Sequence, residues 1–344
     1  MRNWLKVLIL VYYPVSLAQE KEGEIRHALS HKYNLDYRLN YFDKMIFKID
    51  INSEVDNFYI PKLNYTDNKR SIFSPDEKLK LRFSFDYKFL GISYSFSPDF
   101  IPELNNQRAN TKTLDLSFKF FYSDRLRQEV TYKKVKGFTL RNPDDQNPIE
   151  VFDDLEINTI GGKTFYITNK NFSYRAYESQ TERQIKSAGS FMPSLTYFIN
   201  NLYTNNPNSF EQNLERIKSV DFILQLGYMY NYAINKTWFA TGGLHPGIGF
   251  HDSKNYYTNN KESVVFDNKI KWNYNLDLNF SLGYNQENFF SGIRVNYKNY
   301  QYDSKVAADI MNSKFNTVLF IGYRFNEVKS VKKVFEKIEN KFGI

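Results

Sequence analysis

The His-Asp-Ser tripeptide at 251–253 is the clearest candidate for catalysis. On a β-strand, His251 and Ser253 would share one face, which would bring an imidazole to a hydroxyl as in hydrolases with a nucleophilic serine. The indication is weak, because such a tripeptide recurs by chance, no third catalytic residue is evident, and the following polar residues predict an outer loop. We therefore expect no enzymatic activity, with an outer-membrane lipid hydrolase using His251 and Ser253 as the alternative function.

His27 and His31 are the candidates for metal binding. A spacing of four can place two ligands on one helical face, but the glutamate of a His-Glu-x-x-His site is missing and no third ligand lies nearby. The sequence also shows no glycine-rich phosphate loop before a helix and no paired-carboxylate site. These residues predict no metal site and no cofactor.

Charged residues gather between positions 175 and 186, namely Arg175, Glu178, Glu182, Arg183 and Lys186. In a protein that encloses a pore, they could fold into the lumen and form an ionic constriction. They could instead form a solvated loop or a network that braces the wall of the pore. We favour the structural role, because buried charges persist only when they are paired, and pairing by itself explains the mixture of signs.

Long alternating strands are the elements that must position these residues. Apolar or aromatic residues occupy every second position, over lengths that exceed the roughly five or six residues of an ordinary strand. The clearest row has Trp and Tyr at its ends and Leu and Phe in its middle, as a bilayer with aromatic-rich interfaces requires. The pattern predicts an all-β fold, a transmembrane antiparallel up-and-down β-barrel. The alternating rows span Leu79–Tyr87, Leu114–Tyr122, Val220–Tyr232, Trp272–Tyr284 and Phe315–Phe325.

The composition agrees with a barrel and argues against other classes. Aromatic residues make up 18% of the chain, which suits the outer band and the interfacial girdles of a membrane barrel. A mean hydropathy of −0.57, without an apolar run of about twenty residues, argues against a helical membrane protein. The net charge is +8, but basic and acidic residues are interleaved, so nucleic acid is not an expected partner. The absence of Cys excludes a disulfide framework and a lipid-modified cysteine.

Both ends of the chain carry segments that we place outside the barrel. A charged start at Arg2 and Lys6, an apolar stretch and small residues at 16–18 predict a signal peptide. Apolar residues recur at helical spacing from Val328 to Phe342, and we favour a helix resting on the barrel rim or the inner leaflet over one that binds a partner. The predicted regions are a signal peptide at 1–18, a periplasmic N-terminal segment at 19–43, the barrel at 44–326 and a periplasmic amphipathic helix at 327–344.

The strand number follows from the connections. Outer-membrane barrels have short periplasmic turns, longer outer loops and both termini in the periplasm, so the number of strands is even. Alternating short and long connections predict twelve strands. The weak point is 190–203, placed inside a long connection at 183–218, because a strand there would raise the count to fourteen. The strands are predicted at 44–51, 77–88, 90–97, 112–122, 126–139, 155–168, 171–182, 219–233, 237–250, 269–284, 289–302 and 314–326.

One stretch resembles a known family. Phe-Ser-Tyr-Arg-Ala-Tyr-Glu-Ser-Gln-Thr-Glu-Arg-Gln-Ile-Lys-Ser-Ala-Gly-Ser-Phe at 172–191 resembles the most recognisable segment of a Gram-negative outer-membrane barrel family catalogued as domain of unknown function 4421. The hairpin at 78–96 and the segment at 133–140 are similar as well, and the resemblance spans most of the mature chain apart from loop lengths. It implies a barrel, implies no activity and carries over no catalytic residues.

The expected function is that of an outer-membrane barrel acting as a narrow passive channel or as a structural or binding component. Interior side chains and the 183–218 segment could fill a twelve-stranded lumen, and if the lumen conducts, its cations would favour anions. Expected partners are outer-membrane lipid, lipopolysaccharide and the barrel-assembly machinery, since the last strand ends in an aromatic residue, Phe325. The candidate lumen and constriction residues are Lys80, Arg82, Asp86, Asp115, Lys119, Arg175, Glu182, Arg183, Lys186, Arg294, Lys298 and Arg324.

Overall fold

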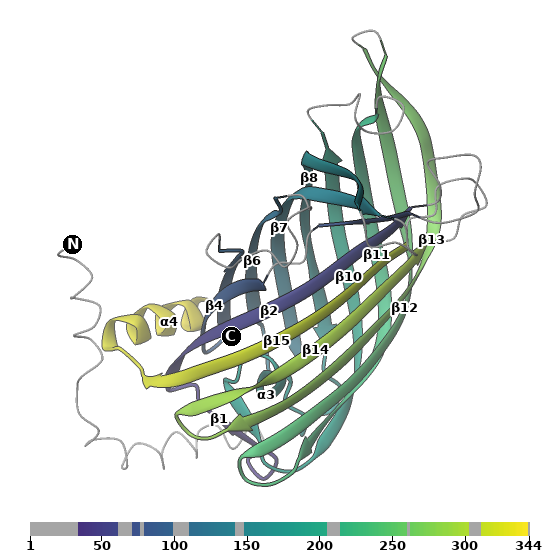
Figure 1. Ribbon diagram of the computed structural model, residues 1–344. Coiled ribbons are helices and arrows are strands. Elements are labelled where there is room, and N and C mark those ends of the chain that lie inside the picture. The colour runs from purple at the N-terminus through teal and green to yellow at the C-terminus, as the bar shows by residue number, and fades with distance from the viewer. Residues whose placement is uncertain are drawn as a thin grey trace, which may run out of the picture.

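The computed structural model describes residues 34–60, 71–75, 79–98, 110–141, 148–204, 214–259, 262–302 and 311–342. Within these ranges, a closed antiparallel 12-strand barrel forms, in which the last strand pairs with the first to complete the ring (Figure 1). The wall consists of β2 (Lys44–Ile60), β4 (Leu79–Tyr87), β5 (Leu90–Phe96), β6 (Lys112–Phe121), β7 (Leu126–Arg141), β8 (Pro148–Tyr166), β10 (Ala188–Tyr203), β11 (Leu214–Ala233), β12 (Trp238–Asn259), β13 (Glu262–Asn285), β14 (Phe289–Tyr302) and β15 (Met311–Asn326). The predicted fold class is confirmed.

The alternating rows face outward, as the sequence predicts. On β11 the side chain of Leu224 is 65% exposed, whereas its neighbour Ile223 is fully buried. Trp272 and Phe280 on β13 are likewise exposed, while the intervening Asn273 is buried. A water-soluble protein would bury such rows, so their exposure over the length of the barrel identifies the lipid-facing surface.

The two ends of the barrel differ. One end, which we call the turn end, is where β2 begins and β15 ends. Short connections join the strands there, at 88–89, 122–125, 234–237 and 286–288. The opposite end is the loop end. There the short strand β3 (Ser71–Ser74) lies between β2 and β7 and continues the wall beyond β4 to β6. In outer-membrane barrels, short connections between strands lie on the periplasmic side.

A β-bulge reorganises the loop end of β7. Gly137 has a positive φ of 89°, and a Cβ at this position would meet the Asn110 carbonyl oxygen at 2.9 Å. The register shift between Lys136 and Phe138 turns Phe138 inward, where it stacks on Phe73 of β3 with ring centroids 4.7 Å apart. An apolar cluster that includes Phe73 of β3 and Phe138 of β7 therefore forms at the loop end.

Several predicted boundaries are wrong, although the count of twelve is right. The 171–182 segment is not a wall strand, and β10 takes its place within the predicted long connection at 183–218. The gaps left between the predicted strands at 52–76, 140–154 and 251–268 are partly filled by strand, because β2, β8, β12 and β13 extend beyond the bilayer-sized rows. The predicted signal peptide, His27 and His31 lie outside the described residues.

The C-terminal helix α4 (Lys329–Phe342) packs against the barrel at the turn end, outside the ring of strands (Figure 1). The Phe335 ring lies 4.7 Å from that of Tyr87 and 5.2 Å from that of Phe89, between centroids. A contact of 2.7 Å between Lys88 Nζ and Glu339 Oε2 fixes the helix to the turn after β4. Among the described residues, no helix has both the length and the apolar character needed to cross a membrane.

Candidate functional site: a plugged lumen

The connection from β8 to β10, residues 167–187, folds into the lumen at the turn end, and we call it the plug. It contains a single helical turn, α3 (Tyr174–Tyr177), whose N-cap Ser173 accepts a hydrogen bond from the Ala176 amide at 3.0 Å. Its strand β9 (Glu182–Gln184) pairs with β1 (Arg38–Asn40), a short strand of the N-terminal segment. Figure 1 shows α3 inside the ring of strands. The plug and the start of the described chain therefore form one unit.

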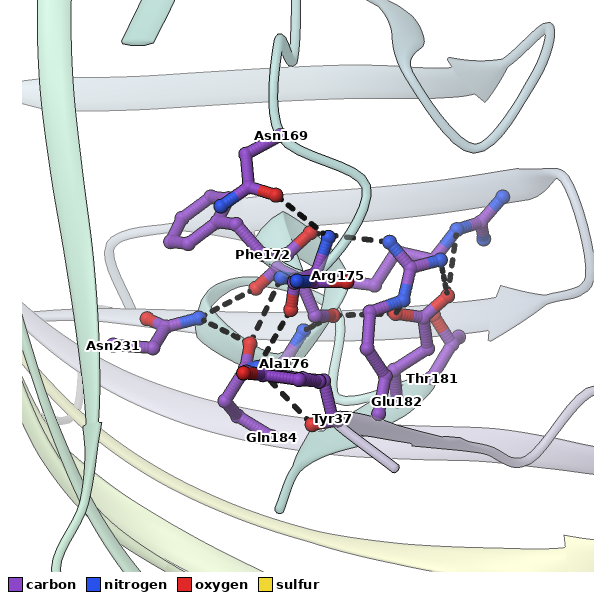
Figure 2. Close-up of polar contacts among 12 residues, drawn as sticks. Tyr37, Asn169, Phe172, Arg175, Ala176, Thr181, Glu182, Gln184 and Asn231 are labelled. Atoms are coloured by element: carbon purple, nitrogen blue, oxygen red, sulfur yellow. Dashed lines mark hydrogen bonds and ion pairs between the residues drawn. The ribbon is translucent and has the colours of Figure 1, made fainter. Parts of the chain in front are cut away.

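Glu182 and Gln184 organise the interior of the plug (Figure 2). Glu182 is 1% exposed, and its carboxylate forms ion pairs with the guanidinium of Arg38 at 3.3 Å and with that of Arg175 at 3.7 Å. The Gln184 side-chain oxygen accepts from the Ser173 amide at 2.9 Å, and its nitrogen donates to backbone carbonyls. A buried amide that uses both donor and acceptor fixes one conformation of the loop around it.

Glu178 joins the plug to the far wall. Its carboxylate lies 2.9 Å from Lys119 Nζ of β6 and forms an ion pair with Arg127 of β7, and all three side chains are buried. Burial by itself raises the pKa of Glu178, but Arg127 and Lys119 prevail and hold that pKa well below its usual value. Glu178 is therefore charged at any physiological pH.

Cations of the wall also cap the backbone of the plug. Arg294 of β14 donates to the carbonyls of Tyr177 and Glu178, and Lys48 of β2 donates to the Glu178 carbonyl at 3.1 Å. Arg324 of β15 donates to the Gln180 carbonyl at 2.7 and 2.9 Å. These carbonyls do not take part in the hydrogen bonds of a β-sheet, so side chains of the wall supply their hydrogen-bond donors.

Asparagines complete the attachment of the plug. Asn231 of β11 donates to the Ser173 carbonyl at 2.7 Å, and Asn285 of β13 donates to the side chain of Gln180 at 2.7 Å. Together with the contacts above, β2, β6, β7, β11, β13, β14 and β15 all hold the plug. Its position inside the lumen is thus fixed from most directions around the ring.

Side chains also bridge the lumen directly. Lys163 of β8 lies 3.4 Å from Asp277 of β13, although three strands separate them in the wall. Lys133 of β7 forms an ion pair with Glu54 of β2, across β4, β5 and β6. The rings of Phe198 on β10 and Tyr300 on β14 meet edge to face at 5.7 Å. A lumen of twelve strands is narrow enough for such contacts to cross it.

Most of the predicted lumen residues point inward, and the structure gives many of them partners. Lys80 contacts Glu54 at 2.8 Å, and Arg82 contacts Asp115 at 3.8 Å. Asp86 is buried, and Lys298 stands opposite Asp277 in the β13–β14 register. Arg183 reaches the Asn285 carbonyl at 3.5 Å, whereas Lys186 is exposed above the Tyr37 ring. The predicted lumen and constriction residues did not include Arg127, Lys48, Lys133 and Asn231, for which inward strand parity was the available signal.

The His251 tripeptide lies on β12 and not in an outer loop, which corrects the prediction. His251 Nδ1 lies 2.9 Å from Asp221 Oδ1 of β11, so Asp221 is the third polar member that the sequence did not reveal. Asp221 is fully buried, whereas the neighbouring Phe250 is exposed on the lipid face. His251 therefore faces the lumen, as does Ser253, two residues further along the strand.

Comparisons with known structures return other barrels. The outer membrane protease OmpT of Escherichia coli is 9% identical, with 83% of this chain and 98% of that chain covered and a TM-score of 0.40. The translocator domain of the autotransporter NalP of Neisseria meningitidis is 9% identical, covering 89% and 95%, with a TM-score of 0.41. The Pseudomonas putida toluene transporter TodX is 7% identical, covering 83% and 91%, with a TM-score of 0.30.

No curated protein sequence matches the chain. The family model described as domain of unknown function (DUF4421) matches residues 35–325, a range that includes β1, the plug and nearly all of the wall. The resemblance of the 172–191 stretch is thereby confirmed, and that stretch forms most of the plug. The chain belongs to the DUF4421 family, which is described as a domain of unknown function.

Proposed function

We propose that the protein is a closed outer-membrane barrel, a structural or binding component and not a passive channel that is open at rest. The observation that carries the proposal is the plug, which places buried, paired charges across the lumen and is held by seven wall strands. The bridges from Lys133 to Glu54 and from Lys163 to Asp277 obstruct the lumen at further levels. A solute could pass only by separating these paired charges, and the free-energy cost of leaving a buried charge unpaired exceeds what contacts with the solute would return.

Planar bilayers test the proposal. The folded protein, identified by its heat-dependent shift on gels, should give no current above that of protein-free bilayers. Steady unitary currents from the same preparation, with the anion preference that inward lysines and arginines would produce, would overturn it. Export by the predicted signal peptide, assembly by the barrel-assembly machinery and contact with lipopolysaccharide belong to the same proposal.

A hydrolase is the second candidate, because the Asp221–His251 hydrogen bond is the type of contact that orients a catalytic imidazole. Its location on the lumen face is unfavourable for a lipid hydrolase, since bilayer lipid meets the opposite face. We expect Ser253→Ala and Asp221→Asn to leave phospholipid and lipopolysaccharide deacylation at the level of the unmodified protein. A loss of deacylation in both variants would favour the hydrolase.

A further inference from the structure

The side of α4 that faces away from the barrel carries a row of lysines. Lys329, Lys333, Lys337 and Lys341 are all exposed and follow one another at intervals of four residues. Four residues advance a helix by about 400°, so the row drifts by about 40° per step and covers a sector of about 120°. We call this sector the lysine face.

The opposite side of α4 is occupied by the barrel. Phe335 is buried against Tyr87 and Phe89, and Glu339 is bound to Lys88. Glu327, just before the helix, accepts a hydrogen bond from the Tyr87 hydroxyl at 2.7 Å. Glu327 and Glu339 therefore contact the barrel, whereas Glu336 is half-buried at the edge of the lysine face, next to Lys329 on the helical wheel, and the four lysines point outward.

The position of α4 is level with the membrane interface at the turn end. Exposed aromatic side chains mark that level around the barrel: Tyr122, Tyr166, Tyr232, Trp238 and Tyr323. Phe89 belongs to the turn on which Phe335 packs, so the helix lies beside the same girdle. Lipid headgroups, not acyl chains, surround a helix at this level.

We propose that the lysine face of α4 binds anionic phospholipid headgroups of the inner leaflet. With five lysines and two glutamates, residues 329–342 carry a net charge of +3, and four of the lysines lie on the side that faces away from the barrel. Val334 is 55% exposed at the border of the lysine face, where it can enter the apolar side of the interface. The phosphodiester anion is the chemistry that a row of flexible ammonium groups fits.

The absence of native cysteine allows a direct test with the full chain in bilayers. Ser330→Cys places one fluorophore on the lysine face, because Ser330 is exposed. Quenching is measured with phosphatidylglycerol or phosphatidylcholine carrying the same nitroxide near the top of the acyl chain. We expect at least about threefold stronger quenching by the anionic lipid at low salt, and nearly equal quenching at 1 M salt.

Two variants separate charge from location. Replacing all four lysines of the lysine face with Gln should remove the preference, and their exposure predicts that the barrel still forms, which the gel shift checks. The control for location replaces two other exposed lysines of the turn end, Lys170 and Lys236, with Gln. This variant should keep the preference for quenching by phosphatidylglycerol. Equal quenching by both lipids at low salt, or a preference that survives the fourfold change, would overturn the proposal. Quenching by neither lipid would also overturn it and leave an acidic protein or cell-wall polymer as the occupant.

Discussion

Neutralising Glu178 should loosen the plug by a measurable factor. The variant Glu178→Gln keeps the size of the side chain but leaves Lys119 without its 2.9 Å carboxylate in a buried site. Arg127 retains Glu129 at 3.7 Å, so part of the charge remains compensated. Breaking a buried ion pair costs about 3–5 kcal/mol, and we take about 3 kcal/mol because of that residual contact. Since about 1.4 kcal/mol corresponds to a factor of ten, the displaced plug should become about a hundredfold more populated.

A buried cysteine in the plug reports that population. Ser179 is 1% exposed, and its hydroxyl bonds to Thr181 at 2.9 Å, so Ser179→Cys is a small change that hides a thiol inside the lumen. A maleimide applied from the turn end can react only when the plug moves. We expect the labelling rate to rise about a hundredfold when Glu178→Gln is added, in the limit where closing is faster than labelling.

The control is Glu339→Gln in the same background, because Glu339 also pairs with a lysine, Lys88, but lies outside the lumen. Its labelling rate should change by less than about twofold, because this ion pair is partly open to solvent and lies outside the lumen. If Glu178→Gln leaves the rate within about twofold of the parent while the barrel remains folded, the ion pairs of Glu178 do not hold the plug, and the reasoning is refuted.

Three further predictions concern pH, the plug backbone and the lipid face. The pKa of Glu178 is depressed, so its contribution to holding the plug is complete above the usual value of 4.5 and is lost only at lower pH. The labelling rate of Ser179→Cys, corrected for the pH dependence of the thiol reaction itself, should therefore give the same population of displaced plug at pH 7 and pH 5, and a larger population at pH 5 would contradict this. Arg324→Met removes the side chain that donates to the Gln180 carbonyl, and it should destabilise the plug by about 1–3 kcal/mol. The expected results are faster labelling of Ser179→Cys and a lower temperature for the gel shift of the barrel. If neither value changes, the prediction is contradicted. Leu224→Lys in the middle of β11 should lower the free energy of unfolding in bilayers by about 2–4 kcal/mol, whereas Tyr232→Lys near the turn end should lower it by about 0–1 kcal/mol. Equal losses in the two variants would show that β11 does not span lipid in this register.

The wall of the barrel could be predicted from the sequence because each strand carries its own evidence. The period of two on a strand depends only on neighbouring residues. A row such as Trp272–Tyr284 therefore shows by itself which face of the strand meets lipid and which face points into the lumen. The even number of strands then followed from the alternation of short and long connections. The lengths of the strands did not, because β12 and β13 continue as a hairpin beyond the apolar rows, where polar and apolar residues no longer alternate.

The tertiary structure alone decided what closes the lumen. Residues 171–182 follow a wall strand and contain aromatic and charged residues, so local pattern cannot separate a strand from a plug. What keeps them inside is the burial of charges and carbonyls against partners distant in the chain: Gln180 and Arg324 are 144 residues apart. The sequence determined which side chains meet lipid, since that depends on each residue and its neighbours. Only closure of the ring brought together the side chains that satisfy the plug, because a buried charge is stable only where its partner also arrives.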